Sequence, residues 1–295
     1  MSNGKLAAIH IHPVKSCRRL VVETARVTAL GLADDRTWQI VDGDGRPVTQ
    51  RQHKALAAVQ PQLLDGGLRL SAPGHDTVEV AAPSAADSEA KSLFGVSVQV
   101  HDAGDDAAAF FSTLTGEPCR LVAIADGGGW SIPEKFGLYD NPLAFVDAAP
   151  VLVATTSSLS WLQDHASEPF GMERFRPNLI IENDEAWVED TWAEFTIGTT
   201  SLAMGMPWPR CPMPQIDQNT VDSLDVARHK EPAKALKEHR WCSDASTMPV
   251  GVRPILEGNG LFGIGCTIGP AGSLVTVGDP LDVVSSDNPL IAPPA

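Results

Sequence analysis

The sequence has no long hydrophobic run. Its first residues, MSNGKLAAIHIHPVKS, hold no apolar stretch of signal-peptide length, and no window reaches the roughly 18 apolar residues that a membrane helix needs. We therefore expect no contact with a membrane. The nucleotide-binding motifs GxGxxG and GxxxxGK[ST] are also missing, as is the zinc-hydrolase motif HExxH. The chain thus offers no motif for a nucleotide cofactor or a catalytic zinc.

Positive charge is scarce. The 295 residues contain 22 Lys and Arg against 37 Asp and Glu, a net charge of −15. This balance argues against nucleic-acid binding, which depends on a basic surface that faces phosphates. Residues 1–54 nevertheless carry nine Lys and Arg against five Asp and Glu, so the rest of the chain carries −19. The local excess indicates either an ordinary solvated surface or a small anion site, and composition does not choose between them.

Cysteine is sparse, and its spacing fits neither disulfides nor a zinc ribbon. The five cysteines are an odd number without any CxxC: Cys17, Cys119, Cys211, Cys242 and Cys266. This pattern predicts reduced thiols in a cytoplasmic protein. Cys119 and Cys266 fall in apolar strand patterns and are expected in the core, and Cys242 is expected to pack beside Trp241.

Most of the chain is typical of short strands closed by glycine turns. Residues 5–12 predict a strand that Pro13 ends, and residues 36–50 and 61–73 predict hairpins with turns at 42–45 and 65–67. Further strands are expected at residues 76–83, 95–102, 119–125, 178–183, 193–198 and 201–208. The last segment, residues 261–284, predicts a hairpin or small meander.

Few helices are expected. Residues 104–116 predict one helix, with Phe110, Phe111 and Leu114 on one face and Gly116 at its end. Residues 149–169 predict a strand, a turn and a helix with Ser157 or Ser158 as N-cap, and residues 235–240 a short helix.

Many short strands and few helices favour a β-rich α+β protein with barrels or sandwiches. The breaker-rich residues 126–142 are interpreted as a loop that connects an N-terminal β domain, residues 1–125, to a second domain, residues 143–285. A proline-rich tail, residues 286–295, follows.

The stretch MPWPRCPMPQID, residues 206–217, stiffens the backbone around one thiol. Pro209 and Pro212 fix φ and remove two amide donors, and Arg210 is a cation next to Cys211. This arrangement suits a metal ligand, whose position must be held closely, but it also suits a buried structural cysteine in a proline-rich turn.

Other polar segments give weaker signals. The segment RFRPN, residues 174–178, offers two guanidinium groups that match phosphate oxygens, although surface salt bridges explain such a pair equally well. The carboxylates of ENDEAWVED, residues 182–190, are interpreted as an acidic surface loop. No histidine has a spacing diagnostic of a catalytic base.

Six segments together resemble the MOSC family, specifically the amidoxime-reducing components and their bacterial relatives. They occur in family order at residues 12–19, 34–38, 174–181, 190–198, 210–217 and 275–284. The resemblance covers nearly the whole chain and implies a MOSC N-terminal β domain followed by a MOSC β-barrel-like domain. It also implies a molybdenum cofactor, which is a pterin dithiolene with a phosphate tail.

The resemblance assigns roles to individual residues. Cys211 matches the cysteine that ligates molybdenum and is the predicted catalytic residue. Lys15 and Ser16 match the phosphate-contacting turn, and Arg36 and Arg176 match other basic contacts to the cofactor. The remaining matches are polar positions of the same cleft, Asn178 and Arg210, and hydroxyls at a strand-to-helix turn, Thr155 and Ser158.

The resemblance implies a reductase of N-hydroxylated or N-oxide compounds. Because no C-x4-C-x2-C spacing indicates a fused ferredoxin, we expect a separate electron-donor protein of the ferredoxin, flavoprotein or cytochrome b5 type. Pro209, residues 212–215 and residues 262–265 depart from the family pattern, which puts substrate preference in question. Two alternatives stay open: a cofactor carrier or sulfur-transfer protein, and a cofactor-free thiol enzyme that uses Cys211 as nucleophile.

Overall fold

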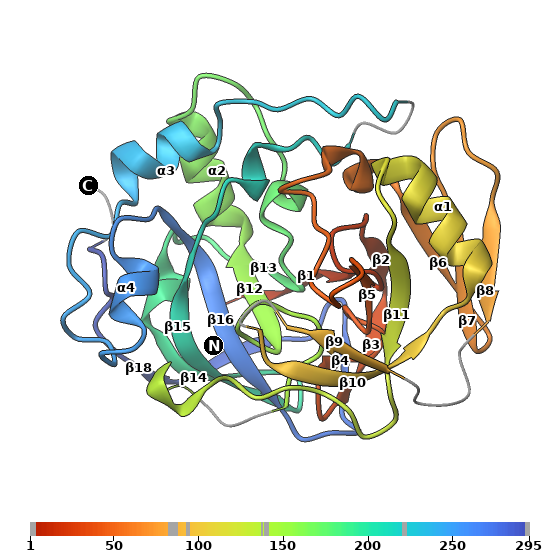
Figure 1. Cartoon of the computed structure of the whole chain (residues 1–295). Helices are drawn as coiled ribbons and strands as arrows, with labels where there is room; N and C mark the ends of the chain where they lie inside the picture. Colours follow the sequence, from red (N-terminus) through yellow and green to blue (C-terminus); the bar gives the residue numbers. More distant parts are fainter. Residues whose placement is uncertain are drawn as a thin grey trace.

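The described strands form four sheets, with short helices at their edges and faces (Figure 1). The structure is a computed structural model and describes residues 4–81, 88–92, 95–136, 138, 142–219 and 223–292. The expected β-rich α+β class is confirmed.

The largest sheet has eight strands and draws on both ends of the chain. In sheet order they are β18 (Leu281–Ser286), β14 (Trp192–Ile197), β15 (Thr200–Pro209), β16 (Leu261–Gly269), β12 (Val151–Thr155), β13 (Leu179–Glu182), β1 (Lys5–Ile11) and β2 (Leu20–Val22). Neighbouring strands are antiparallel except β12 and β13, which are parallel. Since β1 pairs with β13, the first strand of the chain lies beside the strand that follows the RFRPN segment.

Three smaller sheets complete the β structure. The four-stranded sheet contains, in order, β5 (Trp38–Val41), β11 (Arg120–Ile124), β10 (Ser97–Asp102) and β9 (Ser88–Lys91). One three-stranded sheet contains β17 (Leu274–Thr276), β3 (Thr24–Thr28) and β4 (Gly31–Leu32). The other contains β6 (Gln60–Leu64), β7 (Gly67–Ser71) and β8 (Val78–Ala81). The predicted hairpin at residues 61–73 is confirmed as β6 and β7. At residues 36–50, β5 is followed by the expected turn, but its return arm makes only a single bridge, from Pro47 to Val41.

The helices are short. They are α1 (Asp105–Thr115), α2 (Thr156–Asp164), α3 (Ala233–His239), α4 (Arg253–Leu256) and the 3-10 helices η1 (Lys54–Ala58), η2 (Glu134–Phe136), η3 (Met172–Phe175), η4 (Val188–Thr191) and η5 (Met213–Gln215). The predicted α1 is confirmed: Phe110, Phe111 and Leu114 are buried, and Gly116 ends it at φ 76°. Within the described ranges, no helix has both the length and the apolar character to cross a bilayer.

Two predictions of local secondary structure are wrong. The N-cap of α2 is Thr155, whose extended backbone lets its hydroxyl accept from the amide of Ser158. Residues 261–284 form no hairpin, because β16 pairs with β15 and β12, β17 with β3, and β18 with β14. Their pairing partners lie far away in the sequence, and local turn residues do not indicate which distant strands will pair.

The acidic segment at residues 182–190 is also not simply a surface loop. Glu189 and Asp190 are 0% and 3% exposed, and the guanidinium of Arg240 pairs with the Asp190 carboxylate. Charge composition alone could not reveal these partners, since Arg240 is 50 residues away.

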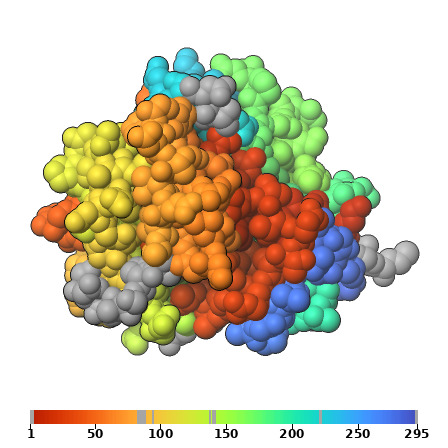
Figure 2. All heavy atoms as spheres, turned by 90° about the vertical axis from the view of Figure 1, so that its right-hand side faces the viewer, coloured from red at the N-terminus to blue at the C-terminus, as the bar shows by residue number. Residues whose placement is uncertain are grey.

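One hydrophobic core joins the two ends of the chain. Leu6, Ile9 and Val27 pack with Val153 and Val275 in a single buried cluster. Figure 2 shows the surface over this core, where red N-terminal atoms lie against blue atoms of the C-terminal strands. The strands β1 and β3 thus bury apolar side chains against strands of the second half of the chain, whereas β5 and β7 pack in a separate cluster of first-half residues. The domain boundaries at residues 125 and 143 stay a prediction.

Candidate functional site

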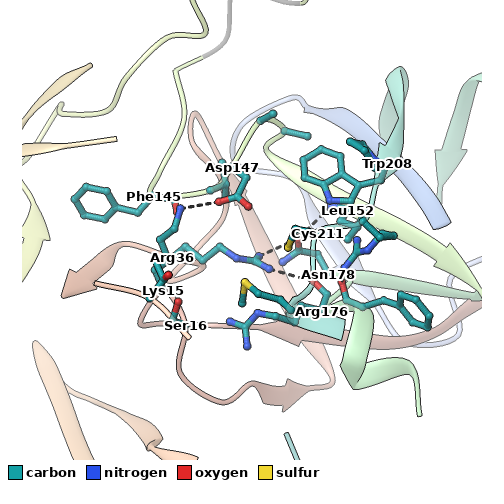
Figure 3. A pocket seen from close by; sticks show the side chains of 18 of the residues that line it. Lys15, Ser16, Arg36, Phe145, Asp147, Leu152, Arg176, Asn178, Trp208 and Cys211 are labelled. Atoms are coloured by element: carbon teal, nitrogen blue, oxygen red, sulfur yellow. Dashed lines mark hydrogen bonds and ion pairs between the residues drawn. The ribbon is translucent and has the colours of Figure 1, made fainter. Parts of the chain in front are cut away.

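A cavity of about 300 Å³ lies where the first turns of the chain meet the ends of β12, β13 and β15 (Figure 3). Seven of the nine predicted site residues line it: Lys15, Ser16, Arg36, Arg176, Asn178, Arg210 and Cys211. Long-range strand pairing brings them together, because β1 and β13 are neighbours and the backbone amide of His10 donates to the carbonyl oxygen of Asn178.

The turn after β1 positions Lys15 and Ser16. The amide of Lys15 donates to Trp38, the amide of Cys17 donates back to Val14, and Ser16 adopts φ 71°. Lys15 Nζ lies 2.8 Å from both the carbonyl oxygen of Phe145 and the Oδ1 atom of Asp147. Burial lowers the pKa of Lys15, and its ion pair with Asp147 opposes that shift. The two hydrogen bonds thus hold the buried ammonium group of Lys15 at the wall of the cavity.

Arg36 links the N-terminal half to the RFRPN segment. Its Nη1 donates to Asp35 at 2.5 Å and to Asn178 Oδ1 at 3.2 Å, and its Nη2 donates to the carbonyl of Arg176 at 3.1 Å. In the described part of the chain, five non-glycine residues have positive φ, and Ser16, Arg36 and Arg176 are three of them. L-residues seldom adopt this conformation, and such strain gathers at functional sites.

The buried Arg176 and the half-buried Arg210 have buried nitrogen atoms without a hydrogen-bond partner among the described residues. Arg176 Nη1 donates to Cys17 and to Gln218, but its Nη2 has no partner among the described residues. Arg210 Nη2 donates to Phe175 at 2.7 Å, and neither its Nε nor its Nη1 has a partner there. Burial lowers the pKa of Arg176 to about 9 and that of Arg210 to about 10. Buried donors left unpaired are costly, so this arrangement indicates an anionic ligand.

Cys211 is a free, partly buried thiol that follows the end of β15. Its Sγ accepts a hydrogen bond from Arg51 Nη2 at 3.6 Å, and the same nitrogen lies 3.4 Å from Asp147 Oδ2. Burial opposes the ionisation of Asp147, but Lys15 and Arg51 together hold its pKa well below the usual range. Arg51 and Asp147 were not predicted as site residues. The local excess of Lys and Arg in residues 1–54 was the one sequence signal for Arg51, and Asp147 had none.

The charged part of the lining is mostly cationic. Five lining residues carry positive charge (Lys15, Arg36, Arg51, Arg176, Arg210), and among the described lining residues Asp147 is the one carboxylate. The remaining wall is largely apolar, with Met206, Trp208, Met213 and Ile255 among its members. The cavity can therefore hold an anion with a flat organic portion beside a thiol.

The structure does not bring Thr155 and Ser158 into this cavity. Both are fully buried at the start of α2, and both hydroxyls donate to Glu189 Oε2, at 3.0 and 2.8 Å. A carboxyl group of the chain itself thus occupies the turn that was predicted to contact the cofactor.

Two family models match consecutive parts of the chain: the MOSC N-terminal beta barrel domain at residues 3–118 and the MOSC domain at residues 140–282. The chain is 32% identical over 288 residues to mitochondrial amidoxime reducing component 2 of Bos taurus, covering 94% of this chain and 82% of that protein. The identity to the Homo sapiens protein of the same name is also 32%, over 290 residues and 94% and 83% of the two chains. A Danio rerio molybdenum cofactor sulfurase is 30% identical over 267 residues, which cover 81% of this chain and 31% of the sulfurase. The chain belongs to the MOSC family.

Proposed function

We propose that this cavity binds a molybdenum cofactor and that the protein reduces N-hydroxylated compounds. One observation carries the proposal: the free thiol of Cys211 shares a cavity with five cations and one carboxylate. The unpartnered nitrogens of Arg176 and Arg210 are donors suited to the negative charge that a pterin dithiolene and its phosphate would bring. The residues present therefore fit the group.

Nine of the lining residues have a role in this proposal. Lys15, Ser16, Arg36 and Arg176 would hold the phosphate and pterin, with Asn178 and Arg210 beside them. Cys211 would be the protein ligand of molybdenum. When bound, the cofactor supplies the two-electron redox chemistry, while the polypeptide supplies ligation, orientation and a shaped pocket. Asp147 keeps Lys15 and Arg51 in place by accepting from both, and Arg51 orients the Cys211 sulfur.

The names of the relatives support the reaction class. The amidoxime reducing components match nearly all of this chain, so we infer two-electron reduction of a small N-hydroxylated or N-oxide substrate. A separate electron-donor protein would reduce the cofactor. The likeness to a molybdenum cofactor sulfurase supports a second candidate, in which the chain carries the cofactor or transfers sulfur.

The test is elemental analysis for molybdenum, with fluorescence of the oxidised pterin, on protein from a cofactor-competent host. We expect near-stoichiometric metal and pterin in the wild type and in Cys119→Ala, a control at a buried thiol outside the cavity lining. Cys211→Ala should lose its molybdenum and all reduction of benzamidoxime by a chemical reductant. A fully loaded, active Cys211→Ala variant would remove the cysteine from its proposed role.

The same preparations separate the two candidate functions. Turnover of benzamidoxime supports the reductase. Release of the cofactor to a molybdenum apo-enzyme, with no turnover of any N-hydroxylated compound, supports the carrier instead.

A further inference from the structure

Two basic lining residues of the cavity, Lys15 and Arg176, are buried, and three of its apolar lining residues are more exposed. Lys15, Ser16 and Arg176 are each at most 7% exposed, whereas Trp208, Met213 and Ile255 are half-buried. In Figure 3, Cys211 lies between the Lys15–Asp147 pair and the ring of Trp208. An anion held by Lys15 and Arg176 would therefore leave the partly exposed ring of Trp208, on the other side of the thiol, for contact with a second molecule.

Gly265 allows the Trp208 ring to form part of this wall. The two residues lie on the paired strands β15 and β16, where Met206 is the partner of Gly265. A Cβ atom at Gly265 would lie 2.5 Å from both Cε3 and Cζ3 of Trp208 and 3.0 Å from Cβ of Ala149. Any larger residue would displace the ring. The tryptophan and the glycine thus form one structural unit, a flat aromatic wall three residues before Cys211.

We propose that Trp208 is a specificity-determining residue whose ring contacts a neutral aromatic group on the substrate. The inference rests on the proposed function, since it places the N-hydroxyl end of the substrate toward Cys211. Aromatic rings favour offset-stacked or edge-to-face contacts, and the Met213 thioether is a second favourable neighbour for a ring. A cationic group on the substrate would find no free carboxylate, because Asp147, the one lining carboxylate among the described residues, already accepts from Lys15 and Arg51. A neutral group needs no such partner.

The test compares two substrates that differ only away from the reacting group. Benzamidoxime and acetamidoxime share the N-hydroxyamidine and differ in phenyl against methyl. We expect Trp208→Leu to lower the ratio of their kcat/KM values, phenyl over methyl, by about tenfold. Trp208→Phe, which keeps an aromatic ring, should retain most of the ratio. Trp241→Leu is the control, because Trp241 is 42% exposed and lies outside the cavity lining.

A binding measurement avoids any dependence on turnover. Saturation-transfer NMR on the cofactor-loaded protein would detect benzamide, which has the phenyl ring but no N-hydroxyl group. The signal should be strong for the wild type and Trp241→Leu and at least several-fold weaker for Trp208→Leu. An unchanged substrate ratio in Trp208→Leu would overturn the proposal. The proposal would also be overturned if Trp208→Leu lost molybdenum and its kcat/KM fell equally for both amidoximes. In that case the ring would hold the cofactor and not the substrate.

The two proposals can fail separately. If the wild type reduces neither amidoxime, the proposed function fails. Benzamide binding that is weaker in Trp208→Leu than in the wild type would still support the aromatic site. Equal benzamide binding by the two proteins would overturn it.

Discussion

Arg51 donates a hydrogen bond to the sulfur of Cys211 across 3.6 Å, although 160 residues separate them in the sequence. Arg51 belongs to the part that matches the MOSC N-terminal domain and Cys211 to the part that matches the MOSC domain. Neither half therefore holds the complete environment of the thiol.

Arg51 should be needed to retain the metal. We expect Arg51→Met to lower the molybdenum content of purified protein several-fold, because the variant loses both the donor to the sulfur and a cation beside Asp147. Arg51→Lys should retain more metal, since it keeps the charge. The control is Arg46→Met, which removes an exposed arginine paired with Asp44. Equal metal contents in all four proteins would show that Arg51 has no part in the site.

Arg210 should lower the stability of the cofactor-free protein while it promotes binding of the pterin. Two of its buried nitrogens have no partner in the described chain, and an unpartnered buried donor costs about 1–3 kcal/mol. Arg210→Met loses one bond to Phe175, so we expect the cofactor-free variant to gain about 1 kcal/mol in its free energy of unfolding in urea. Its pterin content should fall. A variant that is less stable and binds pterin normally would contradict this account, and Arg69→Met, at an exposed ion pair with Glu79, is the control.

Thr155 should matter for folding and leave the cofactor unaffected. Its hydroxyl caps α2 and donates to Glu189, and losing such a cap costs about 1 kcal/mol. We expect Thr155→Ala to lower the urea midpoint while its pterin content per folded protein equals that of the wild type. Thr156→Ala, which leaves the cap intact, is the control. Pterin loss without a stability change would restore Thr155 to the cofactor site.

Glu189 should make stability fall as pH rises. Burial and the neighbouring Asp190 raise the pKa of Glu189 from 4.5 to about 7. The folded protein therefore binds this proton more tightly than the unfolded chain does. Its stabilising contribution is complete below pH 4.5 and is lost as pH rises through 7.

The measurement is urea unfolding of the wild type and Glu189→Gln at pH 5 and pH 8. The variant should gain about 2 kcal/mol relative to the wild type between the two pH values, because glutamine never ionises. Parallel pH profiles for the two proteins would mean that Glu189 titrates normally in the fold.

Many of the strands, α1 and seven residues of the cavity lining could be predicted because their signals are local or ordered along the chain, whereas β2, β3, β4 and β9 were not predicted. Glycine turns and alternating residues mark β6, β7 and β10, and the phenylalanine pair with Gly116 marks α1. The pairing of β17 with β3 and of β18 with β14 could not be predicted, because nothing near these strands encodes a partner more than 80 residues away.

The sequence by itself determined the residue types: a proline-held thiol at Cys211, a basic N-terminal segment in an acidic chain, and the arginines of RFRPN. Only the tertiary structure decided which of these residues share a cavity. It brought Arg51 and Asp147 to Cys211 and kept Thr155 and Ser158 away, in contact with Glu189. The physical reason is that a site at a junction of strands depends on non-local pairing and on which buried polar groups satisfy one another, and both are properties of the folded chain as a whole.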